Sequence, residues 1–259
     1  MASHQGSFIW YELMTKDRAA AARFYGKVLG WSVSHAEGEH PYSEIKAPDG
    51  GSVGGMLPLD AHMIANGARP GWFAYICVDD VDAELDALKG AGGRVFMDQT
   101  LPVGRIAMVA DPQGVPLYLM DPVPPADKPD AVSTAFSPTT EGHVTWNELV
   151  TPDPAGAEAY YTSRFGWERL GAMPMGPMGD YVFLGHGEVR FGALMQAPEG
   201  TQPQWKIYWR TGDIDAAAAR ITEAGGTVTQ QPHEVPGGDW VVQATDPEGA
   251  LFGVVGSRG

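Results

Sequence analysis

The chain contains two copies of one sequence pattern. The segment WYELMTKD at residues 10–17 returns as WNELVTPD at residues 146–153. Further along, the segment DPQG at residues 111–114 returns as DPEG at residues 246–249. Because the matching segments keep their order and nearly their spacing, the 259 residues are predicted to hold two copies of one domain. A duplication of this size limits both the fold and the places where a ligand can bind.

A Pro-rich segment separates the two copies. Residues 123–142 are rich in Pro, Asp, Ser and Thr and show neither helical nor strand periodicity, which is typical of a stiff linker. We therefore expect a first domain at residues 7–122 and a second domain at residues 143–257. Each copy is long enough to bury a core of its own.

The charge balance excludes some classes of partner. The formal net charge is −15, with 17 basic against 32 acidic residues and no basic stripe, so nucleic acid is not an expected partner. No apolar run approaches the roughly 20 residues that a membrane span needs, and no signal pattern opens the chain. The single cysteine, Cys77, cannot form an intramolecular disulfide. We expect a cytoplasmic protein without a membrane partner, and the sequence leaves the oligomeric state open.

Alternating apolar positions and turn signals predict an α+β fold built from β-α-β-β-β units. Thr15 and Thr151 are placed to cap the first helix of each copy, with Pro152 at the first helical position, and Gly30 ends the helix of the first copy. The elements expected in the first copy are strands at 8–14, 42–47, 52–57, 72–78, 94–97, 105–110 and 115–120, and helices at 17–28 and 81–91. Each domain thus holds two units, and the chain holds four.

These motifs resemble the vicinal oxygen chelate superfamily, which includes glyoxalase I, bleomycin-resistance proteins and extradiol dioxygenases. The resemblance rests on Phe24-Tyr25, Leu29-Gly30, the VDDV segment at residues 78–81 and the DPQG turn, all of which recur in the second copy. The Trp-x-Glu-Leu-x-Thr-x-Asp strand is similar to a tandem glyoxalase-like subgroup. The resemblance implies that two β-α-β-β-β units form one cup-shaped mixed sheet, into which metal ligands project.

The metal positions are where this sequence departs from the superfamily. The three places that carry metal ligands there, often His, His and Glu, hold Trp10, Phe73 and Tyr118 in the first copy and Trp146, Lys206 and Gly253 in the second. Indole, phenyl and glycine groups offer no lone pair suited to a divalent metal, and catalytic sites normally use three protein ligands. A slip of two residues would bring in Glu12 and Glu148 without completing a set. The resemblance therefore implies two cups without a metal, and we expect no cofactor.

Strand alternation indicates what lines the cups instead. If Trp10 faces the cup, then Glu12 does too, while Tyr11 and Leu13 pack against the helices. The first cup is then predicted to contain Trp10, Glu12, Phe73, Tyr75 and Tyr118, and the second Trp146, Glu148, Lys206, Tyr208 and Arg210.

Each of these residues has a functional and a purely structural interpretation. The two glutamates are candidate catalytic residues, as general bases or as anchors for a ligand's donor group. Alternatively they form ion pairs, with Lys206 or Arg210 in the second cup and with Arg105 in the first. The two tryptophans either stack on a planar ligand or fill the core.

The remaining candidates are predicted to be structural. The seven histidines show no HxxxH spacing, and we expect all of them, His143 included, at the surface. Cys77 is expected to be a buried small hydrophobe. The loop at residues 172–179, which carries Met173, Met175 and Met178, is either a lid over the second cup or simply mobile.

Three functions remain open. The first is the binding of a small, partly planar organic molecule in aromatic cups, without a metal. The second is an enzyme of the glyoxalase-like lyase or isomerase type, or of the dioxygenase type, that uses Glu12 and Glu148 for proton transfer or holds a metal in a non-standard way. The third is a scaffold whose cups are filled by their own side chains. The fold alone does not choose among them.

Overall fold

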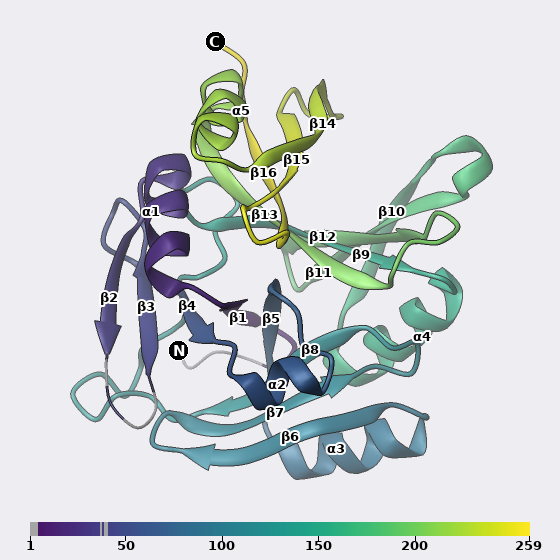
Figure 1. The fold of residues 1–259 in the computed structure, drawn as a ribbon. Helices are drawn as coiled ribbons and strands as arrows, with labels where there is room; N and C mark the ends of the chain where they lie inside the picture. Colours follow the sequence, from purple (N-terminus) through teal and green to yellow (C-terminus); the bar gives the residue numbers. More distant parts are fainter. Residues whose placement is uncertain (1–4, 37, 39–40) are drawn as a thin grey trace. The chain divides into compact units, whose positions relative to one another are not determined.

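The computed structural model describes residues 5–36, 38 and 41–259 (Figure 1). The first repeat contains β1 (Phe8–Thr15), α1 (Arg18–Leu29), β2 (Ser32–Ala36), β3 (Tyr42–Lys46), β4 (Ser52–Pro58), α2 (Ala61–Ala65), β5 (Gly71–Cys77), α3 (Val81–Gly90), β6 (Arg94–Leu101), β7 (Gly104–Ala110) and β8 (Pro116–Pro122). The second contains β9 (Val144–Thr151), α4 (Pro154–Phe165), β10 (Glu168–Pro174), the 3-10 helix η1 (Gly176–Met178), β11 (Asp180–His186), β12 (Val189–Gln196), β13 (Gln204–Asp213), α5 (Ile214–Glu223), β14 (Thr227–Glu234), β15 (Trp240–Thr245) and β16 (Leu251–Ser257).

The strands form one eight-stranded mixed sheet from each repeat. The strand orders are β2-β3-β4-β1-β5-β8-β7-β6 and β10-β11-β12-β9-β13-β16-β15-β14, so the two repeats share one topology. Within each β-α-β-β-β unit the first and last strands pair in parallel, as a helical crossover requires. The predicted α+β class and the four units are confirmed. The strand β2 and the short helix α2 were not predicted.

The chain packs as two compact units, and each unit draws on both repeats. The first, here called the α3–α4 unit, contains the segment ending at Ile9 together with Ala74–Ser133 and Trp146–Trp205. The second, the α1–α5 unit, contains Trp10–Phe73, Thr134–Thr145 and Lys206–Gly259. This division does not define the boundaries expected at residues 122 and 143, which stay a prediction.

Aromatic side chains form the core of the α1–α5 unit. Trp209 is fully buried, and the centroid of its ring lies 4.5 Å from that of Trp31, 5.0 Å from that of Trp72 and 5.5 Å from that of Tyr11. In the same unit α1 and α5 lie side by side, joined by an ion pair between Lys27 and Glu223 at 3.2 Å (Figure 1). The predicted burial of Tyr11 behind its strand is confirmed.

A second aromatic cluster fills the α3–α4 unit. The ring of Trp167 stacks on that of Tyr161 at 5.1 Å and lies 4.6 Å from that of Phe191. Phe8 contacts Trp167 and Trp205. The aromatic residues that follow each first helix in the sequence are therefore core residues, which explains the Gly-Trp signature that closes both helices.

A buried aspartate ties the two repeats together inside each unit. In the α3–α4 unit the hydroxyl of Tyr161 donates to Asp111 at 3.0 Å, and the backbone N–H groups of Gln113 and Val115 donate to the same carboxylate at 2.8 Å. In the α1–α5 unit Tyr25 donates to Asp246 at 3.2 Å. Each tyrosine belongs to one repeat and its aspartate to the other, so these contacts explain why both motifs recur.

The predicted helix caps were wrong. The residues that cap the two helices are Asp17, which accepts from the N–H of Ala20 at 2.9 Å, and Asp153, which accepts from that of Gly156 at 3.0 Å. Pro152 accordingly lies before the helix, and Pro154 occupies its first turn. The hydroxyl of Thr15 donates instead to Glu248 at 2.7 Å.

The first helix of the second repeat, α4, begins with the same arrangement in the α3–α4 unit. The hydroxyl of Thr151 bonds to Gln113, whose side-chain oxygen also accepts from the N–H of Asp153 at 3.0 Å. The two threonines therefore fasten the turn of one repeat to the helix start of the other. The ending of the first helix at Gly30 was predicted correctly, with a φ of 73°.

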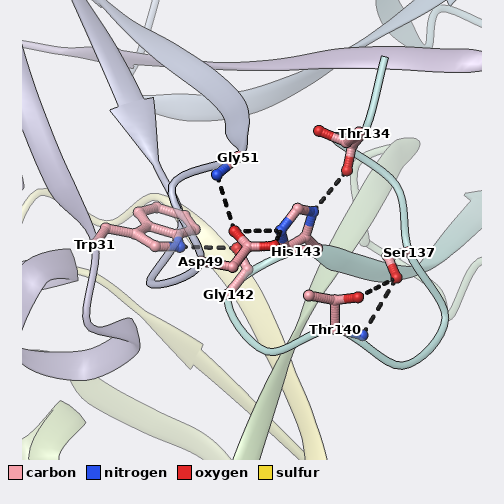
Figure 2. Close-up of polar contacts among 8 residues, drawn as sticks. All are labelled: Trp31, Asp49, Gly51, Thr134, Ser137, Thr140, Gly142 and His143. Atoms are coloured by element: carbon pink, nitrogen blue, oxygen red, sulfur yellow. Dashed lines mark hydrogen bonds and ion pairs between the residues drawn. The ribbon is translucent and has the colours of Figure 1, made fainter. Parts of the chain in front are cut away.

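His143 lies in a polar cluster next to the end of the Pro-rich segment (Figure 2). Its side chain is 3% exposed, so the expected surface position was wrong. The ring contacts the carbonyl oxygen of Thr134 at 2.6 Å and both carboxylate oxygens of Asp49 at 3.1 Å. Beside it, Trp31 donates to the carbonyl oxygen of Gly142 at 2.8 Å. These contacts anchor residues 134–143 to the core of the α1–α5 unit.

The other histidines belong to regular elements or lie outside the described residues. His143 is the one buried histidine in the part of the chain that the structure describes. His4 and His40 lie outside the described residues, and the others occupy β2, α2, β11 and β14. Among the helices of residues 5–36, 38 and 41–259, none has the length and apolar character needed to cross a lipid bilayer.

The two buried aspartates predict a pH dependence of stability. Burial raises the pKa of Asp111 and of Asp246, more than their hydrogen bonds lower it. A raised pKa in the folded state means that the native chain binds protons more readily than the unfolded chain as the pH falls. Relative to Asp111→Asn, the wild-type protein is therefore expected to gain stability as the pH falls from 7 toward 4.5.

Urea unfolding of the two proteins at both pH values measures this difference. Asp127→Asn, at an exposed position, serves as the control and should follow the wild type at both pH values. If the free energy of unfolding of the wild type falls relative to that of Asp111→Asn on acidification, the prediction is contradicted.

Candidate functional site

A hydrogen-bonded chain joins the two candidate residues of β1. In the α1–α5 unit the indole N–H of Trp10 donates to the hydroxyl of Tyr42 at 2.9 Å, and this hydroxyl is hydrogen-bonded to the carboxylate of Glu12. Glu12 is only 3% exposed, whereas Trp10 is half-buried. The hydroxyl fits here because Gly55 lies opposite Glu12 on β4, where an added Cβ would come within 2.0 Å of it.

The second repeat builds the same chain inside the α3–α4 unit. Trp146 donates to the hydroxyl of Tyr181 at 2.8 Å, and Tyr181 donates to Oε2 of Glu148 at 2.9 Å. Glu148 is 7% exposed and Trp146 is half-buried, as in the first repeat. Phe183 adds an aromatic ring 6.2 Å from that of Trp146. We call these two arrangements the Trp-Tyr-Glu chains.

Both tyrosines of these chains remain protonated in the ordinary pH range. Burial, and after it the negative charge of the neighbouring glutamate, holds the pKa of Tyr42 and of Tyr181 well above its usual value. A neutral phenol beside a carboxylate is a hydrogen-bond donor. Neither tyrosine was predicted as a site residue, although the two occupy matching places in the two repeats, before β4 and before β12.

In each repeat a tyrosine of the fifth strand, β5 or β13, lies against the position on the last strand to which the superfamily resemblance assigns a glutamate. In the α3–α4 unit Tyr75 pairs with Tyr118, and their rings stack at 4.2 Å and 7°. In the α1–α5 unit Tyr208 pairs with Gly253 in the same register, and an added Cβ on Gly253 would come within 2.1 Å of the Tyr208 ring. Aromatic rings thus occupy the surroundings of both positions to which the superfamily resemblance assigns a glutamate.

Next to this last-strand position, the second repeat carries polar side chains that the first repeat lacks. Gln243 of β15 accepts from the ammonium group of Lys206 at 3.3 Å and donates to the hydroxyl of Tyr208 at 2.9 Å. Gln243 was not predicted. In the first repeat Met108 pairs with Tyr118 as Gln243 pairs with Gly253, so the corresponding position there is apolar.

Arg210 is engaged away from the Trp-Tyr-Glu chains. Its guanidinium group forms an ion pair with Asp239 at 2.6 Å. It also lines a pocket of about 330 Å³ together with Lys27 and Arg220. Arg105, predicted as a partner of Glu12, forms ion pairs with Asp82 at 2.8 Å and Asp98 at 3.1 Å.

The ten predicted site residues are divided between the compact units. The α1–α5 unit holds Trp10, Glu12, Phe73, Lys206, Tyr208 and Arg210, and the α3–α4 unit holds Tyr75, Tyr118, Trp146 and Glu148. The structure joins Trp10 to Glu12, Trp146 to Glu148, Tyr75 to Tyr118 and Lys206 to Tyr208, in each case inside one unit. Their assembly into two cups stays a prediction, as does the pairing of Glu148 with a basic residue.

The donor groups in the described part of the chain form no cluster that suits a metal ion. Within residues 5–36, 38 and 41–259, no three His, Cys, Asp or Glu side chains gather in a way that could hold one. Cys77 was correctly predicted to be buried, and burial raises the pKa of its thiol to about 12, so it is a poor ligand and a poor nucleophile.

The methionine-rich segment is partly ordered as regular structure. Met173 belongs to β10, and Met178 ends the 3-10 helix η1. Met178 lines a pocket of about 340 Å³ beside α4. A role of this segment as a lid stays a prediction.

Comparison with known proteins identifies the family. The model of the glyoxalase/bleomycin resistance protein/dioxygenase superfamily matches residues 7–119 and 140–254. The chain therefore belongs to this superfamily, and the resemblance found in its motifs is confirmed.

Similar proteins extend over nearly the whole chain. "Putative glyoxylase CFP32" of Mycobacterium bovis is 31% identical over 264 residues, which cover 97% of this chain and 95% of that protein. The anthracycline biosynthesis protein DnrV of Streptomyces peucetius is 27% identical over 267 residues, covering 98% and 94%. The Mn(II)-bound glyoxalase of Novosphingobium aromaticivorans shares the fold, with a TM-score of 0.64 at 17% identity, covering 100% of this chain and 83% of that one.

Proposed function

We propose that this chain binds a small, partly planar organic molecule in its predicted cups, without the metal ion that is typical of the superfamily. The observation that carries this proposal is the pair of Trp-Tyr-Glu chains. Each places a buried carboxylate beside a half-buried indole ring, and it does so in both repeats. An aromatic wall with few, fixed polar groups is the usual composition of a site for a planar ligand.

The side chains at the expected metal positions support the metal-free part of the proposal. Tyr118 stacks against Tyr75, and the ring of Tyr208 covers Gly253, so neither final-strand position offers a carboxylate. Trp10 and Trp146 bring an N–H group, which donates and has no lone pair for a metal. The residues present do not fit the superfamily's metal, and we assign no metal-dependent step to this chain.

The names of two similar proteins suggest the chemical class of the ligand. DnrV and DauV are both named as anthracycline biosynthesis proteins. An anthracycline is a planar, polycyclic aromatic molecule that carries hydroxyl groups, which suits stacking on an indole and donation to a carboxylate. We therefore propose a polycyclic or similarly planar aromatic molecule as the ligand class.

A fluorescence titration with doxorubicin, as one anthracycline within a panel of planar aromatic molecules, tests the proposal. We expect saturable binding by at least one panel member, unchanged after treatment with EDTA. Glu148→Gln should weaken it about tenfold, because the ligand loses a charge-assisted hydrogen bond. Elemental analysis of the purified protein should find metal far below one equivalent. No binding across the panel, or binding that needs a stoichiometric metal, would refute the proposal.

The alternative proposal is an enzyme that uses Glu12 and Glu148 as proton-transfer bases. Its support is the name of CFP32 as a glyoxylase together with the two buried carboxylates. Turnover of a hemithioacetal that is lost in Glu12→Gln and Glu148→Gln, with the fold intact by circular dichroism, would favour the enzyme over the binding protein.

A further inference from the structure

We infer that Tyr42 and Tyr181 are positioning residues that hold Glu12 and Glu148 as fixed hydrogen-bond acceptors, so that the cups select ligands which present a hydrogen-bond donor. The inference rests on the proposed function for the ligand, but its structural part concerns only the two Trp-Tyr-Glu chains.

The direction of each chain is fixed by its first member. An indole nitrogen only donates, so the hydroxyl of Tyr181 must accept from Trp146 and direct its own proton elsewhere. The group that receives this proton is Oε2 of Glu148, at 2.9 Å. The carboxyl group of Glu148 is therefore the acceptor at the end of the chain, and the hydroxyl of Tyr181 is its donor. In the first repeat Trp10, Tyr42 and Glu12 follow the same order.

Burial makes the chain rigid as well as directional. Tyr181 is anchored at two points, and Glu148 is 7% exposed, so neither side chain can turn freely into solvent. The tyrosine comes from β11, whereas the other two residues lie on β9, so the chain connects two strands that are not neighbours in their sheet. A carboxylate held from one side by a side chain of another strand is preorganised for an acceptor role.

Two copies of one arrangement argue against coincidence. The strand position opposite the glutamate differs between the repeats, with Gly55 opposite Glu12 and Ala193 opposite Glu148. The indole, the phenol and the carboxylate are nevertheless kept in both. Core packing alone would be satisfied by phenylalanine at the tyrosine positions, so the hydroxyl groups serve the polar partners.

The consequence for the ligand is a matter of hydrogen-bond chemistry. A carboxylate that already accepts from a phenol repels a ligand carbonyl and attracts a hydroxyl, amine or ammonium group. A planar ligand with such a donor gains both stacking and a charge-assisted hydrogen bond. A planar ligand with only acceptors gains stacking alone.

The test uses full-length protein labelled with 3-fluorotyrosine, whose resonances for Tyr42 and Tyr181 are assigned from Tyr42→Phe and Tyr181→Phe. We expect both resonances to titrate at higher pH than free 3-fluorotyrosine, and the Tyr181 resonance to titrate at lower pH in Glu148→Gln than in wild type. Tyr160→Phe, the same change at a tyrosine outside the chains, is the matched control and should leave both resonances unchanged. This readout needs no ligand.

A second measurement addresses the ligand, with doxorubicin as a donor-bearing probe and anthraquinone-2-sulfonate as a planar probe without a donor. We expect Tyr181→Phe to weaken doxorubicin binding about tenfold and to change anthraquinone-2-sulfonate binding less than twofold. If the Tyr181 resonance titrates at the same pH in Glu148→Gln as in wild type, the inference is overturned even if the probes bind. If the resonances titrate as expected but neither probe binds, the proposed function is overturned, and with it the requirement on the ligand.

Discussion

Asp111→Ala is expected to destabilise the protein by about 3–5 kcal/mol, because one change removes three hydrogen bonds from a buried position. The carboxylate accepts from the hydroxyl of Tyr161 and from the backbone N–H groups of Gln113 and Val115. Alanine would leave all three donors without this partner at a site where the native side chain is 3% exposed. Urea unfolding followed by circular dichroism measures the loss.

The same change elsewhere in the chain provides the comparisons. Asp246→Ala should cause a similar loss, since Asp246 accepts from Tyr25, Glu248 and Ala250 in the α1–α5 unit. Asp127→Ala, at an exposed position, should shift stability by less than about 0.5 kcal/mol. If Asp111→Ala unfolds at the same urea concentration as Asp127→Ala, the buried aspartate does not hold the two repeats together.

The effect of Asp111→Ala depends on a feature that no local pattern in the sequence contains. The aspartate turn was visible as a motif, and its recurrence was visible too, but its partner is the tyrosine of the other repeat. Periodicity describes which face of an element is apolar, not which distant element covers it. Each repeat therefore predicted its own elements, whereas the division of the core into two mixed units needed the structure.

Predictions from alternation succeeded because strand geometry is local. Tyr11 and Leu13 are fully buried, as expected if Trp10 and Glu12 share the opposite face of β1. On β13 the alternation is the same, and Ile207 and Trp209 are fully buried. A strand side chain faces one of two sides, so a few large apolar residues are enough to decide the whole strand.

The errors arose where a short polar side chain had several possible partners. Thr15 and Asp17 both precede α1, and both can cap a helix, but the carboxylate of Asp17 reaches the free N–H group while Thr15 bonds to Glu248. His143 was expected at the surface because no HxxxH spacing gave it a role as a metal ligand. It is buried because Asp49, 94 positions away, and Thr134, nine positions away, supply both ring nitrogens with partners.

The candidate site was found only in part for the same reason. The motif residues Trp10, Glu12, Trp146 and Glu148 were selected from their strands, and the structure joins them in pairs. The linking residues Tyr42 and Tyr181 lie about 30 residues further on in otherwise ordinary strands, the latter 33 positions after Glu148. Their role depends on strand order and register, which the sequence did not specify.

A single methyl group on β12 is the second change with a large expected effect. Gly192 pairs with Asn147 of β9 in the parallel ladder, and an added Cβ would lie 2.0 Å from the carbonyl oxygen of Asn147. Backbone cannot move aside as a flexible side chain can, so Gly192→Ala must push the two strands apart. We expect a loss of about 3 kcal/mol, at the upper end of the cost of overpacking.

The equivalent glycine of the first repeat should behave in the same way, because an added Cβ on Gly54 would lie 2.2 Å from the carbonyl oxygen of Tyr11. Gly90→Ala is the matched control, since no atom lies within 4 Å of an added Cβ at the end of α3, and it should raise stability by about 0.4–1 kcal/mol. Urea unfolding of the three variants ranks them. Equal midpoints for Gly192→Ala and Gly90→Ala would mean that β9 and β12 are not held as closely as the register requires.

The glutamates of the Trp-Tyr-Glu chains lie one residue from these contacts, on β1 and β9, so a loosened ladder should also weaken ligand binding in both repeats.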